Sequence, residues 1–278
     1  MNEDRDLVVA LARGLQVLGS FSAQATSLTV SELADRTGLP KATVSRLTYT
    51  LGELGFLRRL DDKRRYAPGA AVLALAYPVL ASLQIRQVAQ PYMRELSDYA
   101  RVNVSLAMLD RDRLVYVETC RTTALTTDHR PDIGVIWSLT EGAIGRAFLA
   151  GLPEAERTPL VNALRVQDPE RSHLLDDRMR QAFEDYRRDG FCTALAEVRP
   201  GLYGVAAPVK QAIDGNRFAF TCALAAEPGA KERMMNDVGP RLIQMVATIE
   251  SAMDSLDRMR NTNPVRRIAS QRMGKTRA

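Results

Sequence analysis

The stretch TVSELADRTGLPKATVSRLTYTLGELGFL, residues 29–57, has the features of two short helices joined by a tight turn. Thr29 and Glu32 have the spacing of a capping box, in which each side chain satisfies a free backbone N–H at the start of a helix. Gly38 then ends that helix, and Pro40 stands in the first turn of the next, where its missing N–H costs nothing. The stretch therefore predicts one helix that starts near Thr29 and a second that follows Pro40 at once.

The second predicted helix divides into an apolar stripe and a polar face. Apolar residues recur at helical spacing and are expected to point inward, namely Val44, Leu47, Leu51 and Leu54. Polar or amphipathic residues are expected to point mostly outward, namely Lys41, Thr43, Ser45, Arg46, Thr48 and Tyr49. This arrangement is typical of a helix-turn-helix, whose second helix lies in the major groove of DNA. We expect base-edge contacts from that face, with Arg46 reaching a base or a phosphate and the other candidates being Lys41, Thr43, Ser45 and Tyr49.

The flanking segments complete a winged helix-turn-helix over residues 7–69. A first helix is predicted from a buried stripe of Leu11, Leu15, Leu18 and Phe21. After Gly55, two short strands around the acidic turn Asp61-Asp62 predict a wing, which can reach phosphates or the minor groove. Its basic residues are candidate DNA contacts, namely Arg58, Arg59, Lys63, Arg64 and Arg65. A basic cluster alone is often only a solvated surface, but the order and spacing of these pieces favour DNA binding.

The next segment, residues 70–83, is predicted to be a linker helix. Its run Ala70–Ala76 is too apolar for a free linker and needs a partner surface, which self-association could supply. One recognition helix covers only half of a symmetric DNA site. We therefore expect a homodimer or a homotetramer.

Charge and composition set limits on the rest of the chain. The 278 residues carry a net charge of +5, and the final 21 residues, 258–278, contain seven basic and no acidic side chains. That basic tail is expected to be disordered, or else an accessory DNA contact. A hydrophobic content of 46% without a run of about 20 apolar residues favours a soluble protein with no membrane contact. Its acidic first residues are unlike a secretory signal, so the cytoplasm is the expected location.

The sequence offers no catalytic or metal site. It has no GxSxG, P-loop or GxGxxG motif, and its two histidines, His129 and His173, have no paired ligand spacing. Three widely separated cysteines, Cys120, Cys192 and Cys222, are expected to be small buried hydrophobes. We expect no enzyme, no metal and no cofactor.

The larger second part, residues 84–257, is predicted to be an α+β domain. A helix opened by Pro91 precedes an antiparallel hairpin of residues 102–108 and 114–117. Two later strands, residues 203–209 and 217–226, are joined through the turn Asp214-Gly215-Asn216. Helices are predicted near residues 140–150, 176–188 and 230–259. Antiparallel strands mixed with helices give this fold class.

Several motifs resemble the IclR family of bacterial transcriptional regulators. They are RGLQVL at 13–18, LADRTGLPKATVSRL at 33–47, LGELGFL at 51–57, TEGAIGRAFLA at 140–150 and GLYGVAAPV at 201–209. The likeness covers nearly the whole chain except the basic tail. It implies a winged helix-turn-helix, a linker helix and a GAF-like effector-binding domain with an antiparallel sheet. It also implies dimers or tetramers on partly palindromic operators.

The same resemblance locates a candidate effector pocket. The helix opened by Gly142–Gly145, with Ala143 and Ile144, offers backbone N–H groups that attract anions. Relatives that sense small keto acids carry an acidic residue, a cysteine and two serines on the strands, where this chain aligns Ala194, Gly204, Leu224 and Ala226. Such a wall lacks partners for a hydrophilic acid and favours an apolar, aromatic one. Polar or stacking contacts are expected from Thr126, His129 and Trp137, although Trp137 could equally be core or an interface anchor.

The expected function is a sequence-specific DNA-binding regulator of a catabolic operon, controlled by a small organic acid with an aromatic or apolar body. The alternative is an architectural DNA-binding protein without a ligand. An enzyme is the remaining class, and it would turn over a substrate without needing DNA.

Overall fold

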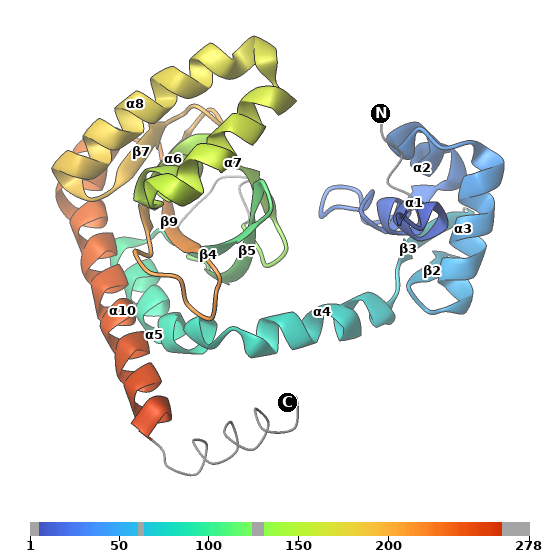
Figure 1. Cartoon of the computed structure of the whole chain (residues 1–278), viewed down its shortest axis with the longest axis horizontal. Coiled ribbons are helices and arrows are strands. Elements are labelled where there is room, and N and C mark those ends of the chain that lie inside the picture. The colour runs from blue at the N-terminus through green and yellow to red at the C-terminus, as the bar shows by residue number, and fades with distance from the viewer. Residues whose placement is uncertain (1–5, 61–63, 124–130, 263–278) are drawn as a thin grey trace, which may run out of the picture. The chain divides into compact units, whose positions relative to one another are not determined.

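A computed structural model describes residues 6–60, 64–123 and 131–262. The chain divides into two compact units, residues 1–82 and 83–278. Figure 1 shows the elements of both units along the chain.

The N-terminal unit packs three helices on a small sheet. The helices are α1 (Val9–Leu18), α2 (Val30–Thr37) and α3 (Lys41–Glu53). Strands β1 (Leu28–Thr29), β3 (Arg65–Pro68) and β2 (Leu57–Leu60) form an antiparallel sheet in that spatial order. The core between them includes Val17, Leu33, Val44 and Leu57. A helix-turn-helix with a two-stranded wing is therefore present, as predicted.

The predicted capping box is confirmed at the start of α2. The Thr29 N–H donates to Glu32 Oε2 at 2.6 Å, and the Glu32 N–H donates to Thr29 Oγ1 at 3.2 Å. Gly38 closes the helix with a φ of 68°, a left-handed conformation that glycine adopts at no steric cost.

The predicted apolar stripes of α1 and α3 are partly wrong. Leu11 and Leu15, which were predicted to be buried, are 62% and 55% exposed. The buried residue of α1 is Val17, and the helix ends at Leu18, before Phe21. In α3, Leu54 is exposed beyond the last helical residue, whereas Thr48 is fully buried. Thr48 can be buried because its hydroxyl donates to the Ser45 carbonyl oxygen at 3.0 Å.

Helix α4 (Ala70–Ser82) follows the wing and contains Pro78. None of its residues, 70–82, is buried, and none is charged. No single helix in the described ranges is long and apolar enough to cross a membrane. Helix α4 and the helix that follows it, α5 (Gln84–Ala100), satisfy that criterion only when they are counted together.

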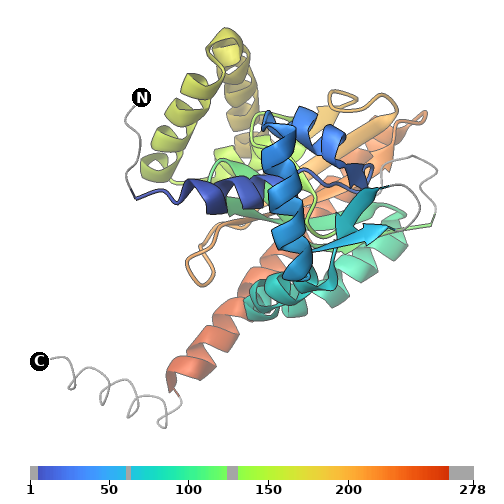
Figure 2. The same ribbon diagram turned by 90° about the vertical axis from the view of Figure 1, so that its right-hand side faces the viewer.

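The C-terminal unit is built on one six-stranded antiparallel sheet with the spatial order β6-β5-β4-β9-β8-β7. Its strands are β4 (Asn103–Asp110), β5 (Arg113–Cys120), β6 (Ile136–Ser138), β7 (Cys192–Leu195), β8 (Leu202–Pro208) and β9 (Phe218–Ala225). Helices α5 (Gln84–Ala100) and α10 (Gly239–Thr262) lie side by side on one face (Figures 1 and 2). On the other face α6 (Gly142–Gly151) packs against β8, with α8 (Ser172–Asp189) beside it. The α+β prediction is therefore confirmed.

Three boundaries in this unit differ from the prediction. Helix α5 begins at Gln84 instead of Pro91, because buried residues such as Ile85, Ala89 and Met93 hold it on both sides of the proline. The predicted last helix is interrupted, with α9 (Ala230–Arg233) and a π-helical turn at Met234–Val238 before α10. Residues 258–262 belong to α10, so the start of the basic tail is helical.

Some elements were not predicted at all, namely β6, β7 and α7 (Glu154–Gln167). The cysteine prediction is confirmed, since Cys120, Cys192 and Cys222 are free and buried. Burial raises the pKa of Cys192 to about 12, which keeps its thiol protonated and unreactive at neutral pH.

Candidate functional site

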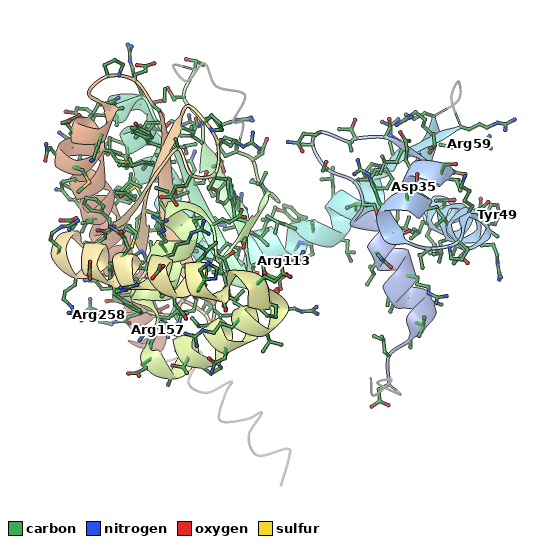
Figure 3. All side chains as sticks on the ribbon, turned by 90° about the horizontal axis from the view of Figure 1, so that it is seen from above. Asp35, Tyr49, Arg59, Arg113, Arg157 and Arg258 are labelled. Carbon is green, nitrogen blue, oxygen red and sulfur yellow. The ribbon has the colours of Figure 1, made fainter. Side chains whose placement is uncertain are left out.

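The outward face of α3 carries most of the predicted DNA-contacting side chains. Lys41, Ser45 and Arg46 are exposed, Thr43 is half-buried, and Tyr49 is 67% exposed. Figure 3 shows Tyr49 extending outward from the unit. Burial of Val44 and Thr48 on the opposite face fixes the rotation of the helix, so the exposed set forms one continuous polar surface.

The wing adds exposed arginines to this unit. Arg58 and Arg59 lie next to each other in β2, opposite Ala67 and Tyr66, and both are exposed. Successive side chains of a strand point to opposite faces, so these two arginines diverge. Figure 3 shows Arg59 extending outward from the wing. Arg64 is exposed with a φ of 49°, and Lys63 lies outside the described residues.

Arg65 differs from the other basic residues of the wing. Its guanidinium lies 3.1 Å from Glu32 Oε2 and donates to both the Oγ (3.0 Å) and the carbonyl oxygen (2.6 Å) of Ser27. These contacts join β3 to the start of α2. Arg65 therefore holds the wing in position, and its contact with DNA stays a prediction.

We expect Thr29→Ala to destabilise the N-terminal unit by about 1 kcal/mol, since the α2 N-terminus loses its cap. The hydrogen bond from the Thr29 N–H lowers the pKa of Glu32 below 4.5, and Arg65 adds a smaller effect. A lowered carboxyl pKa stabilises the folded unit above pH 4.5, and this contribution disappears as the pH falls through the lowered value. Hydrogen exchange of α2 amides measures the stability lost in Thr29→Ala, with Ser31→Ala as the control. Equal protection in both variants would show that the cap contributes nothing.

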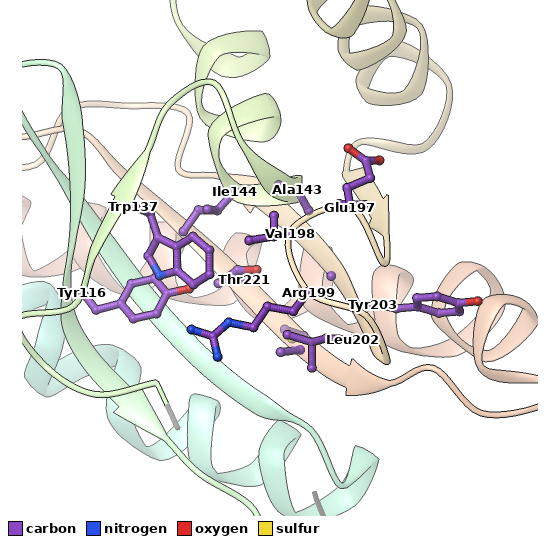
Figure 4. A pocket seen from close by; sticks show the side chains of 15 residues that line it. Tyr116, Trp137, Ala143, Ile144, Glu197, Val198, Arg199, Leu202, Tyr203 and Thr221 are labelled. Carbon is purple, nitrogen blue, oxygen red and sulfur yellow. The ribbon is translucent and has the colours of Figure 1, made fainter. Parts of the chain in front are cut away.

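A cavity in the C-terminal unit lies between the start of α6, the strands and the segment that joins β7 to β8 (Figure 4). Five of the residues predicted for an effector pocket line it: Trp137, Ala143, Ile144, Ala194 and Gly204. Thr126 and His129 lie outside the described residues. Leu224 and Ala226 do not line the cavity.

The strand register explains the two misplaced residues. Ala223 pairs with Gly204 and Leu224 pairs with Tyr203, so Leu224 points to the face opposite Ala223. The cavity is lined by Thr221 and Ala223, and Ala226 follows the end of β9. Thr221 and Ala223 therefore line the cavity where the prediction had Leu224 and Ala226, and a shift by an odd number of residues exchanges the two faces of a strand.

The start of α6 forms one wall of the cavity. Gly142, Ala143 and Ile144 are buried, and the preceding Glu141 makes no capping hydrogen bond with its side chain among the described residues. Uncapped N–H groups and the helix dipole favour an anion or a hydrogen-bond acceptor at this end.

Two aromatic residues that face each other form a second wall. The rings of Tyr116 on β5 and Trp137 on β6 lie 6.0 Å apart and are tilted by 41°. Burial raises the pKa of Tyr116 above its ordinary value of 10, so its hydroxyl stays neutral. Tyr116 was missed at the sequence level, although the alternation of apolar residues in β5 could have located it. Residues 197–199 of the β7–β8 segment were also missed, and they carry no comparable periodicity.

Two family models match the chain, one in the N-terminal unit and one mainly in the C-terminal unit. The IclR helix-turn-helix domain model matches residues 10–61, and the model of the C-terminal part of bacterial IclR transcriptional regulators matches residues 77–251. The chain belongs to the IclR family of bacterial transcriptional regulators. It is therefore a DNA-binding regulator, and its relatives are regulators instead of enzymes.

Individual IclR-family relatives agree with this assignment. The HTH-type transcriptional regulator TsaQ1/TsaQ2 of Comamonas testosteroni is 33% identical, with 89% of each chain covered. The crystal structure of an IclR family transcriptional regulator from Brucella abortus is 38% identical with a TM-score of 0.75, covering 90% of this chain and 94% of that one. An IclR homologue from Microbacterium hydrocarbonoxydans, complexed with 4-hydroxybenzoate, shares the fold at 21% identity and a TM-score of 0.67, covering 88% and 99% of the two chains.

Proposed function

We propose that this IclR-family regulator reads an operator with α3 and the wing, and that a small organic acid with an aromatic or apolar body, bound in the cavity beside α6, changes its DNA binding. The regulated genes are proposed to form a catabolic operon. One observation carries the ligand proposal. The start of α6 has no side-chain cap, and it borders a cavity whose wall includes Tyr116, Trp137 and small apolar residues. The 4-hydroxybenzoate bound by the Microbacterium homologue has this chemistry.

The cavity wall disfavours small hydrophilic acids. Ala194, Gly204 and Ala223 present no side-chain hydrogen-bonding group where a keto acid would need one. Each polar group buried without a partner costs about 1–3 kcal/mol, which lowers affinity by one or two decades. A ring instead gains contact with apolar walls and with the aromatic pair.

The cavity is smaller than an aromatic ligand. Its volume of about 50 Å³ is smaller than the roughly 150 Å³ cavity that accommodates benzene in an engineered protein. Val198 is exposed at the edge of the cavity, and we propose that it moves aside to admit a ring. Ligand binding is therefore proposed to displace the β7–β8 segment.

A ligand screen tests the proposal. Thermal shift and operator release are measured with benzoate-like acids, glyoxylate and pyruvate. We expect the aromatic acids to raise the melting temperature and alter operator binding more than the keto acids do. A stronger response to glyoxylate or pyruvate would contradict the proposed ligand class. Operator binding with little sequence preference and no response to any acid would instead favour an architectural DNA-binding protein.

Arg46→Ala is expected to weaken operator binding in one of two distinguishable ways. If Arg46 contacts a base, the loss is about 1–3 kcal/mol and relaxes sequence preference at one position. If it contacts a phosphate, binding to all sequences weakens and the salt dependence falls by about one unit. Binding assays over a salt series separate these outcomes, with Arg13→Ala, at an exposed position of α1, as the control. Unchanged affinity and salt dependence would show that the face of α3 has been misplaced.

A further inference from the structure

We infer that Arg199 selects for a carboxylate in the effector cavity, binding the acid group of a planar ligand whose ring lies against Tyr116 and Trp137. The inference rests on the proposed effector function of this cavity. Arg199 belongs to residues 196–201, which join β7 to β8, and it lines the cavity. Figure 4 shows its guanidinium turned toward the side of the cavity where Tyr116 and Trp137 lie.

The charges around the cavity leave Arg199 uncompensated. Among the described lining residues only Glu197 and Arg199 are charged. Glu197 is already ion-paired with Arg146 of α6, whose side chain is 12% exposed and also donates to the Thr193 carbonyl oxygen at 2.8 Å. The guanidinium of Arg199 has no hydrogen-bond or ion-pair partner within the described part of the chain. The cavity wall thus has one positive charge available to a ligand.

The chemistry of this charge favours a carboxylate over other polar groups. A guanidinium presents parallel N–H donors that match the two oxygens of a carboxylate, and charge-assisted bonds of this kind are stronger than neutral ones. The wall is apolar at Ala194, Leu202 and Ala223, and these residues offer contact to the ring of the ligand. An amide of the same shape keeps the ring contacts but loses the negative charge and one acceptor oxygen.

Paired ligands of equal shape test this assignment in the full-length protein. Calorimetry and the fluorescence of Trp137, the single tryptophan of the chain, measure the binding of benzoate and benzamide. The wild type is expected to bind benzoate more tightly. Arg199→Gln is expected to lower benzoate affinity about 10-fold to 100-fold, the usual effect of losing a charged hydrogen bond, and to leave benzamide affinity unchanged. Arg199→Lys keeps the positive charge but lacks the parallel N–H donors of a guanidinium. Its benzoate affinity is expected to lie between those of the wild type and Arg199→Gln.

Arg187→Gln is the matched control, since Arg187 is an exposed arginine of the same unit that does not line the cavity. It is expected to bind both compounds as the wild type does. Loss of benzoate and benzamide affinity by equal factors in Arg199→Gln, or no loss in either, would overturn the role of Arg199 while leaving the cavity as the effector site. Failure of the wild type to bind either compound would overturn both proposals.

Discussion

The double substitution Leu73→Glu with Leu75→Glu is expected to yield monomers at micromolar concentration and to weaken operator binding at least about 100-fold, the usual scale of lost bivalency. The two side chains are 75% and 64% exposed on α4, a helix without charged or buried residues. A large exposed apolar surface of this kind marks a partner interface. We propose a second copy of this chain as the partner, because a symmetric operator needs two recognition helices.

The substitution is designed to change the surface and not the helix. Glutamate is nearly as good a helix former as leucine, so α4 itself should persist. Light scattering reports the assembly state and a binding assay reports operator affinity. Gln181→Glu with Gln211→Glu adds the same charge at two exposed polar positions of the C-terminal unit and should change neither. A double variant of α4 that still forms oligomers with full operator affinity would remove the proposed interface.

Local chemistry explains which parts of the fold could be predicted. The capping box of Thr29 and Glu32 and the left-handed Gly38 are determined by residues within one turn of each other, so they could be read directly. Apolar periodicity located α3, but it does not show whether an apolar stripe is covered by the same chain or by a partner. Leu11 and Leu15 repeat with helical spacing and yet stay exposed in the chain, since periodicity does not separate a core from a surface awaiting a partner.

The proposed effector cavity could be predicted only at residues that belong to a sequence motif. Ala143 and Ile144 lie in a motif that marks the start of a helix. On β9, by contrast, the strand register decides whether Ala223 or Leu224 faces the cavity, and a sequence motif does not fix that register. Arg199 lies in an irregular connection, where neither periodicity nor a turn signature gives the direction of a side chain. Its place in the cavity follows from tertiary structure alone.

Gly145→Ala is expected to destabilise the C-terminal unit by more than the about 1–3 kcal/mol of ordinary overpacking. A Cβ atom at Gly145 would lie 2.3 Å from the carbonyl oxygen of Leu139 and 2.7 Å from its carbonyl carbon. Both are backbone atoms of a fully buried residue, so the chain and not a flexible side chain has to move. Because the first turn of α6 also lines the cavity, ligand binding should be lost together with stability.

Gly204→Ala is the matched comparison, because a Cβ there would meet the Ala143 Cβ at an ordinary distance of 3.5 Å. Alanine also restricts the unfolded chain, so this variant should be as stable as the wild type or up to about 1 kcal/mol more stable. Its methyl group nevertheless narrows the cavity between β8 and α6 and should weaken binding of an aromatic acid. The midpoint of thermal unfolding should therefore fall in Gly145→Ala and stay unchanged or rise in Gly204→Ala, by roughly 2–4 °C per kcal/mol, while ligand affinity falls in both variants. Wild-type stability in Gly145→Ala would show that α6 does not pack closely against the backbone of Leu139. Undiminished ligand affinity in Gly204→Ala would show that the effector binds elsewhere.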